Sequence, residues 1–144
     1  AAVRLGGDEF LLFVDLDRFK EVNDTFGHAT GDEVLIETGR RLSRAIRDSD
    51  FLARIGGDEF VVLLNEINSV DDAALVASTI REALHGPIHT GSSSLVVTPS
   101  IGISLFPEDG EEADSLLAHA DAAMYRVKTD GRDNLRFYSA RENP

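Results

Sequence analysis

The segment Gly56-Gly57-Asp58-Glu59-Phe60 lies between two apolar runs, Asp50–Ile55 and Phe60–Leu64. Two glycines between strand-like runs predict a tight β-hairpin. Two adjacent carboxylates on such a turn repel each other, and this repulsion does not stabilise a fold. The pair therefore predicts a bound cation at the tip of the hairpin.

A second acidic cluster follows another apolar run. Phe10–Val14 ends in Asp15-Leu16-Asp17, and two acidic clusters at strand ends predict a divalent-metal site of the kind used in phosphoryl chemistry. The pentapeptide also occurs at Gly6–Phe10. A strand rises about 3.3 Å per residue, so Asp8 is expected roughly 20 Å from Asp15. We interpret this copy as a loop that enters the first strand.

Composition narrows the function classes. The 144 residues suffice for one domain with a core, and the 42% apolar content is ordinary. There is no apolar run near 18 residues, no signal-peptide pattern and no cysteine, so we expect no membrane insertion, no disulfide, no thiolate zinc site and a cytoplasmic location. The net charge of −12 argues against a nucleic acid polymer as partner but favours solubility, and it leaves room for a small nucleotide.

The hydrophobic pattern predicts an α+β fold. Its expected strands are 10–15, 50–55, 59–64, 95–105 and 134–138, and its expected helices are 19–26, 31–47, 72–85 and 113–127. This order is typical of a ferredoxin-like or palm-type antiparallel sheet flanked by helices, with an extra helix after the first strand. In such a sheet the first strand can lie beside the hairpin, so Asp15 and Asp58 could converge on one metal.

Three local signals refine this pattern. Thr30-Gly31-Asp32-Glu33 fits a capping box at the start of helix 31–47. Pro99 interrupts strand 95–105 and favours a sheet edge or a bulge there. The segment 87–94 could form a small hairpin with Gly91-Ser92 as its turn.

Several spaced motifs together resemble the GGDEF domain of diguanylate cyclases, whose fold is nucleotidyl-cyclase-like. They span about residues 10–138 and occur in the family's order. The motifs are Asp15-Leu16-Asp17-Arg18-Phe19-Lys20, Asn23-Asp24, Gly27-His28, Gly31-Asp32, Gly56–Phe60, Ala122–Lys128 and Gly131-Arg132. The family usually opens with a helix, whereas only Ala1–Glu9 precede the first strand here, so we expect a single GGDEF domain over 1–144 with a truncated opening helix.

The resemblance implies a reaction and a metal site. Two GTP molecules, each held by one domain of a homodimer, would be joined into cyclic di-GMP with release of two pyrophosphates. Asp58 and Glu59 would be catalytic, and Asp15, the Leu16 carbonyl, Asp58 and Glu59 would hold Mg²⁺ or Mn²⁺. Glu59 would assist deprotonation of the 3′-hydroxyl or hold the second metal. The alternatives are a strand-end cap for Asp15 and turn formation for the hairpin acids.

The resemblance also implies a substrate site. Asn23 and Asp32 would recognise guanine, although Asn23 could be a backbone cap and Asp32 a first-turn helix anion. Lys20, Lys128 and Arg132 would bind the phosphates, and the backbone N–H groups from Leu16 to Phe19 would line the triphosphate. Phe19 is thereby also a substrate-binding residue. Lys128 also suits the end of a helix, where a cation complements the helix dipole.

An inhibitory product site is implied at Arg47 and Asp50, five residues before Gly56, where the pair would bind cyclic di-GMP. The alternative is a helix end with a dipole-matched arginine and a turn aspartate.

Two other functions remain open. The tail Gly131-Arg132-Asp133-Asn134 with Phe137-Tyr138 resembles GGDEF domains fused to an EAL phosphodiesterase, with a sensor as a further fused partner. Such a unit could bind GTP or cyclic di-GMP and regulate its partner without making product. A different palm-like nucleotidyl transferase is the third possibility, since paired acids on such a sheet are common to these enzymes.

Overall fold

The computed structural model describes residues 9–91 and 93–139. Its central sheet has the order β2-β3-β1-β6-β7, and within it β6 and β7 pair in parallel while the other neighbours are antiparallel. This arrangement confirms the α+β fold. The elements are β1 (Glu9–Leu16), α1 (Phe19–Phe26), α2 (His28–Ala45), β2 (Phe51–Arg54), β3 (Glu59–Leu64), α3 (Val70–His85), β4 (Ile88–Thr90), β5 (Ser93–Leu95), β6 (Pro99–Phe106), α4 (Ala113–Thr129) and β7 (Asn134–Phe137).

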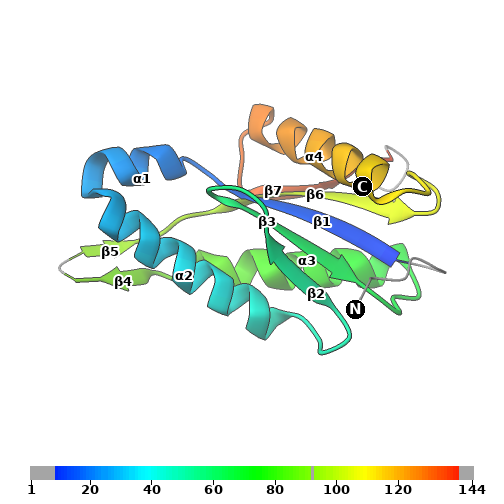
Figure 1. Cartoon of the computed structure of the whole chain (residues 1–144), viewed down its shortest axis with the longest axis horizontal. Helices are drawn as coiled ribbons and strands as arrows, with labels where there is room; N and C mark the ends of the chain where they lie inside the picture. The colour runs from blue at the N-terminus through cyan, green and yellow to red at the C-terminus, as the bar shows by residue number, and fades with distance from the viewer. Residues whose placement is uncertain (1–8, 92, 140–144) are drawn as a thin grey trace.

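The sheet is covered by helices on both faces (Figure 1), with α4 on one side and α2 and α3 on the other. Side chains alternate along a strand, so β1 serves both layers. Leu12 and Val14 pack into the core beneath α2 and α3, whereas Leu11 and Phe13 pack beneath α4. The next residue in the second series is Asp15, which places its carboxylate on the α4 side of the sheet.

Helix α4 packs unusually close to β6. A Cβ atom at Gly102 would collide with the backbone carbonyl of Ala120 and the backbone amide of Met124. On the same strand Ser100 and Ser104 are fully buried. The apolar and polar residues of β6 therefore do not separate a core face from a solvent face, because both faces are covered.

The prediction that Pro99 marks a sheet edge or bulge is wrong. The expected strand 95–105 divides into β5 and β6, and β6 lies in the interior of the sheet between β1 and β7. Pro99 is the first residue of β6, a position that proline tolerates because it need not extend the hydrogen-bond ladder. The small hairpin is confirmed as β4 and β5, with Gly91 at φ 46°; Ser92 lies outside the described residues.

The capping box predicted at Thr30 is also wrong. Helix α2 begins at His28, three residues before the predicted start, and Gly27 precedes it with φ 91° and no side-chain cap. Glycine adopts such an angle without strain, which lets α1 turn directly into α2. Asp32 consequently lies in the second turn of the helix. The helix ends at Ala45, so Arg47 lies in the following turn.

Among the described residues, none of the helices is both long and apolar enough to cross a membrane. The acidic copy near the N-terminus is only partly described. Glu9 pairs with Phe106 at the end of β1 opposite to Asp15, and Asp8 lies outside the described residues.

Candidate active site

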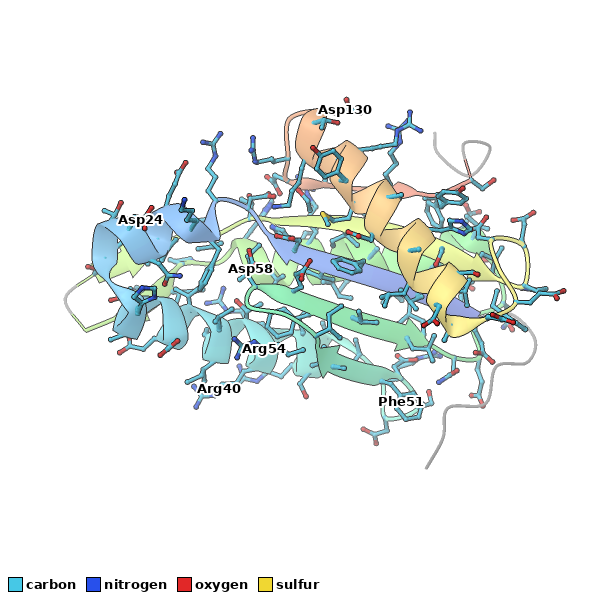
Figure 2. All side chains as sticks on the ribbon, turned by 45° about the horizontal axis from the view of Figure 1, so that its top comes forward. Asp24, Arg40, Phe51, Arg54, Asp58 and Asp130 are labelled. Atoms are coloured by element: carbon cyan, nitrogen blue, oxygen red, sulfur yellow. The ribbon has the colours of Figure 1, made fainter. Side chains whose placement is uncertain are left out.

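Carboxylates from two neighbouring strands meet at one end of the sheet. Asp15 near the end of β1 is paired directly with Glu59 at the start of β3. The Leu16 amide donates a hydrogen bond of 3.2 Å to the backbone carbonyl of Asp58, which lies in the turn between β2 and β3 (Figure 2). Because Asp15 and Glu59 are partners in an antiparallel ladder, their side chains lie on the same face of the sheet.

Burial and neighbouring acids raise the pKa values of Asp15 and Glu59. Burial is the largest cause raising the pKa of Asp15, from an ordinary 3.8 to about 6. A hydrogen bond from Lys128 opposes this change, and the charges of Asp58 and Glu59 add to it. Burial, followed by the charges of Asp58 and Asp121, also raises the pKa of Glu59. The site is therefore short of positive charge.

Lys128 from the last turn of α4 is the cation nearest to these acids. Its Nζ lies 2.9 Å from an Asp15 oxygen and 3.4 Å from an Asp17 oxygen. Sequence reasoning assigned this lysine to phosphate. In the structure it contacts carboxylates, and its role toward phosphate stays a prediction.

The donors at this edge suit a hard cation. Within residues 9–91 and 93–139, no group of three or more histidine, aspartate or glutamate side chains is arranged as a finished metal site. The oxygen donors of Asp15, Asp58, Glu59 and the Leu16 backbone are nevertheless the kind that Mg²⁺ prefers. Burial and the neighbouring negative charges both disfavour the ionised forms of Asp15 and Glu59, and a divalent cation would offset this.

Asp17 organises the base of the site, although it was not among the predicted site residues. Its buried carboxylate accepts hydrogen bonds from Thr98 Oγ1 at 2.7 Å, Ser100 Oγ at 2.6 Å and the Asp133 amide at 2.9 Å. Three donors together with Lys128 make this a fixed structural acid. The sequence offered a partial signal, since Asp17 belongs to the predicted acidic cluster, but its partners lie far along the chain.

The glycine turn shapes the acidic tip. A Cβ atom at Gly56 would lie too close to the Glu59 carboxylate, so the absence of a side chain there lets Glu59 fold over the turn. Arg54 donates to the carbonyls of Gly56 at 3.1 Å and Gly57 at 2.9 Å. Sequence reasoning missed this arginine, which ties the turn to β2.

The two residues predicted to recognise guanine lie where α1 and α2 pack together. Asn23 packs closely against Gly31. A Cβ atom at Gly31 would collide with the Asn23 amide oxygen and approach the Phe19 ring. Asp32 follows Gly31 on α2 and is exposed. Since Asp32 is outside the first turn, helix-dipole stabilisation no longer accounts for it.

The predicted phosphate residues are placed less uniformly. Lys20 and Arg132 are exposed, whereas Phe19 is buried in the core. The predicted lining by amides from Leu16 to Phe19 is wrong in part: the Leu16 amide binds the Asp58 carbonyl and the Asp17 amide binds the Thr98 carbonyl at 2.8 Å. The amides of Arg18 and Phe19 remain as candidates.

The predicted inhibitory pair is bonded to itself. Asp50 is buried and accepts from the Arg47 amide at 2.9 Å, the Arg47 guanidinium at 3.0 and 3.2 Å, and the Asn65 amide at 3.1 Å. Burial alone would raise the pKa of Asp50, but these hydrogen bonds lower it. Arg47 also donates to the Asn65 carbonyl. The pair thus closes the turn before β2, and its role toward product stays a prediction.

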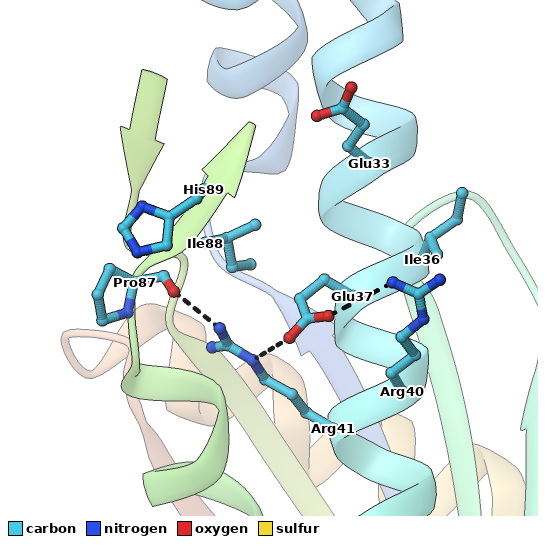
Figure 3. Close-up of a pocket in the computed structure, with 8 residues that line it drawn as sticks. All are labelled: Glu33, Ile36, Glu37, Arg40, Arg41, Pro87, Ile88 and His89. Carbon is cyan, nitrogen blue, oxygen red and sulfur yellow. Dashed lines mark hydrogen bonds and ion pairs between the residues drawn. The ribbon is translucent and has the colours of Figure 1, made fainter. Parts of the chain in front are cut away.

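A groove of about 500 Å³ lies between α2 and β4 (Figure 3), away from the acids. Arg41 bridges it by donating to Glu37 on its own helix and to the carbonyls of Gly86 and Pro87. None of the predicted site residues lines this groove. Arg41 joins α2 to the chain after α3. The lining residues are Glu33, Ile36, Glu37, Arg40, Arg41, Pro87, Ile88 and His89.

Comparison with known families agrees with this geometry. The family described as "Diguanylate cyclase, GGDEF domain" matches residues 8–134. The chain belongs to this family. The GGDEF domain is similar to diguanylate cyclase TpbB of Pseudomonas aeruginosa, with 45% identity over 127 residues that cover 88% of this chain and 29% of that protein. It is also similar to the cyclic di-GMP phosphodiesterase NbdA of the same species, with 39% identity over 90% of this chain and 16% of that protein.

Solved structures have the same fold. An EAL/GGDEF domain protein from M. capsulatus superposes with a TM-score of 0.89 at 45% identity, covering 96% of this chain and 90% of that one. The GGDEF domain of DgcB from Caulobacter crescentus, solved in complex with c-di-GMP, gives 0.85 at 29% identity, covering 92% and 79%. The chain spans less than a third of the two curated relatives, 29% and 16% of their lengths.

Proposed function

We propose that this GGDEF domain is a diguanylate cyclase that joins two GTP molecules into cyclic di-GMP and releases two pyrophosphates. The carrying observation is the direct pairing of Asp15 with Glu59 on the α4 face of the sheet, beside Lys128. Relatives named diguanylate cyclase support the same reaction.

A divalent cation, Mg²⁺ or Mn²⁺, is part of the proposal. Asp15, the Leu16 carbonyl, Asp58 and Glu59 would hold it. When bound, it would offset the charge that builds on the phosphate oxygens during displacement. The raised pKa values of Asp15 and Glu59 support this role, because these acids lack a full complement of cations.

Each half-reaction forms one bond and breaks one. The 3′-oxygen of one GTP attacks the α-phosphorus of the other, and the bond from that phosphorus to pyrophosphate breaks. The 3′-hydroxyl proton passes to Glu59, or to solvent if Glu59 instead holds a second metal. Lys128 exchanges its contact with Asp15 for the triphosphate, where Lys20 and Arg132 also bind. Two such steps close the ring, which requires two domains to face each other.

The guanine base would lie at the junction of α1 and α2. There the Asp32 carboxylate accepts from the guanine N1–H and 2-amino groups, which adenine does not offer together, and Asn23 binds the purine edge. The packing of Asn23 against Gly31 supports this position, because it fixes the amide between the two helices. Adenine nucleotides are accordingly excluded as good substrates.

The test is incubation of the domain with GTP and Mg²⁺, followed by chromatography of the nucleotides. Cyclic di-GMP is the expected product. The Asp58→Ala and Glu59→Ala variants should fold and form none, whereas Glu82→Ala, which removes an exposed acid of α3, should retain the wild-type rate. A folded, dimeric preparation that binds GTP without yielding product would refute the cyclase.

Product binding at Arg47 and Asp50 completes the proposal, with cyclic di-GMP as inhibitor. Because all the contacts of Asp50 are internal, the exposed Arg47 guanidinium is the group that a ligand would reach. Calorimetric titration of the Arg47→Ala variant with cyclic di-GMP tests this site. An affinity equal to that of the wild type would remove it.

A regulatory role is the second candidate. The similarity to a phosphodiesterase and to an EAL/GGDEF protein favours it. In this case GTP or cyclic di-GMP would bind without turnover and alter a fused EAL partner, itself under the control of a sensor. Binding without product, together with changed activity of the full-length protein, is the result that distinguishes it.

A further inference from the structure

The loop after α4 has an unusual backbone. Gly131, Arg132 and Asp133 have φ angles of 112°, 65° and 48°. A left-handed conformation is unfavourable for a non-glycine residue, so two in succession require contacts that hold them. The loop lies between Lys128 and β7 and carries Arg132, and both cations are phosphate candidates.

Asp133 supplies those contacts with all of its polar groups. Its amide donates to the buried Asp17 carboxylate at 2.9 Å. Its carbonyl and carboxylate accept from Arg81 Nε at 3.1 and 3.0 Å, and its carboxylate lies 2.6 Å from His85 Nε2. One residue thus joins α3 to the acid at the base of the site.

The contacts of Asp133 are suited to positioning more than to overall stability. Arg81, His85 and Asp133 each retain about a third of their side-chain exposure, so solvent screens the ion pairs and limits their stabilising energy. The same contacts nevertheless fix the position and orientation of the strained loop relative to α3 and Asp17.

Asp17 connects this loop to the cation of the site. The carboxylate that receives the Asp133 amide also lies 3.4 Å from Lys128 Nζ. Release of Asp133 would therefore free Arg132 in the loop and remove one of the three donors that hold the carboxylate beside Lys128.

We propose that Asp133, held by Arg81 and His85, is a positioning residue that aligns Lys128 and Arg132 for the triphosphate of GTP. The inference rests on the proposed function. It assigns α3 a part in substrate binding, although no residue of α3 is among the predicted site residues.

The experiment compares the double variant Arg81→Ala/His85→Ala with Arg136→Ala. The control removes a cation of β7 that contacts the same loop, since Arg136 lies 3.5 Å from the Asp130 carboxylate. Two ligands are titrated with Mg²⁺ present, a non-hydrolysable GTP analogue and guanosine, and exchange of the Asp133 amide with deuterium is followed in parallel.

Release of the loop should weaken analogue binding about ten-fold, leave guanosine binding within about two-fold, and speed exchange of the Asp133 amide about ten-fold. Arg136→Ala should match the wild type in all three. Unchanged analogue affinity, unchanged exchange or equal loss of both ligands would overturn the proposal, because a purely structural role would not separate phosphate from base.

Asp133→Asn provides a second measurement if the double variant does not fold, because asparagine tolerates the left-handed backbone. This variant should bind the GTP analogue about three-fold more weakly and bind guanosine as the wild type does. Equal affinity of wild type and variant for the analogue would count against the proposal. A wild type that does not bind the analogue would defeat the proposed function, and the exchange rates would still decide whether Asp133 is held by α3.

Discussion

The carboxylates of Asp15 and Asp50 are both largely shielded from solvent, but they differ in their partners. Asp15 faces two other acids and one lysine, and its pKa rises to about 6. Asp50 receives four hydrogen bonds from Arg47 and Asn65, and its pKa falls. Burial raises the pKa in both cases, so the donors decide the outcome. An under-compensated acid marks a place for a ligand, whereas a fully bonded one marks a place where the chain is fastened.

Replacement of Asp15 gives the largest expected effect on activity. Asp15→Asn should reduce cyclic di-GMP formation roughly 10³-fold, because it removes a proposed metal ligand. The metal-free protein should be as stable as the wild type, or more stable by up to about 2 kcal/mol, because the ionised carboxylate opposes folding at neutral pH. Product chromatography and urea unfolding without metal measure the two effects. A marked loss of stability would contradict this assignment.

Replacement of Asp50 should have the reverse pattern. Asp50→Ala leaves the Arg47 and Asn65 amides without their acceptor and should lower the free energy of unfolding by about 2–3 kcal/mol. Urea unfolding measures this change. Arg40→Ala is the baseline, since its exposed contact with Glu37 is worth at most about 0.5 kcal/mol. Equal stability of the two variants would show that the turn is not fastened by Asp50.

The turn glycine tests whether the position of Glu59 matters apart from its charge. Gly56→Ala should push the Glu59 carboxylate aside and lower product formation about 10- to 100-fold, because geometry at a reacting centre is worth that much. The free energy of unfolding should change by less than about 1 kcal/mol, since the displaced atom is the end of a flexible side chain. Steady-state kinetics and thermal unfolding of the same preparation separate the two. Wild-type activity would show that Glu59 is not held by the turn.

The smallest effect is the pH dependence of metal binding. A folded Asp15 with a pKa near 6 retains its proton where an unfolded one, at 3.8, has lost it. The metal-free fold should therefore lose stability as the pH rises from about 4 to about 6, with no further change above. Mn²⁺ affinity should rise about ten-fold per unit over the last part of this interval and then level off. Calorimetry from pH 5 to pH 8 tests this, and Asp15→Asn should flatten the profile.

The sequence predicted the hairpin and the meeting of the acids at one end of the sheet. The hairpin followed from two glycines between apolar runs, and the meeting of Asp15 with the hairpin acids followed from the order of strands. It misplaced the start of α2, because the capping signal at Thr30 was stronger than the signal of Gly27, whose φ of 91° is not evident from its neighbours. Pro99 was misjudged because an interior strand can begin with proline.

Long-range polar contacts were beyond sequence reasoning. Asp17 binds residues more than 80 positions away, Thr98 and Ser100, and Asp133 binds Arg81 and His85 on a helix about 50 residues earlier. No spacing rule connects such residues, since the fold alone brings them together. These contacts are also the ones that hold the candidate site in place.

The missing side chain of Gly102 sets how far a lysine can extend. Because no side chain separates the strand from the helix, the backbone of α4 lies directly on β6. This close packing brings the Lys128 side chain within contact distance of Asp15. A methyl group at this point would collide with the helix backbone and push α4 away from the strand. The Lys128 ammonium group would then move away from Asp15, although every residue of the site itself was unchanged.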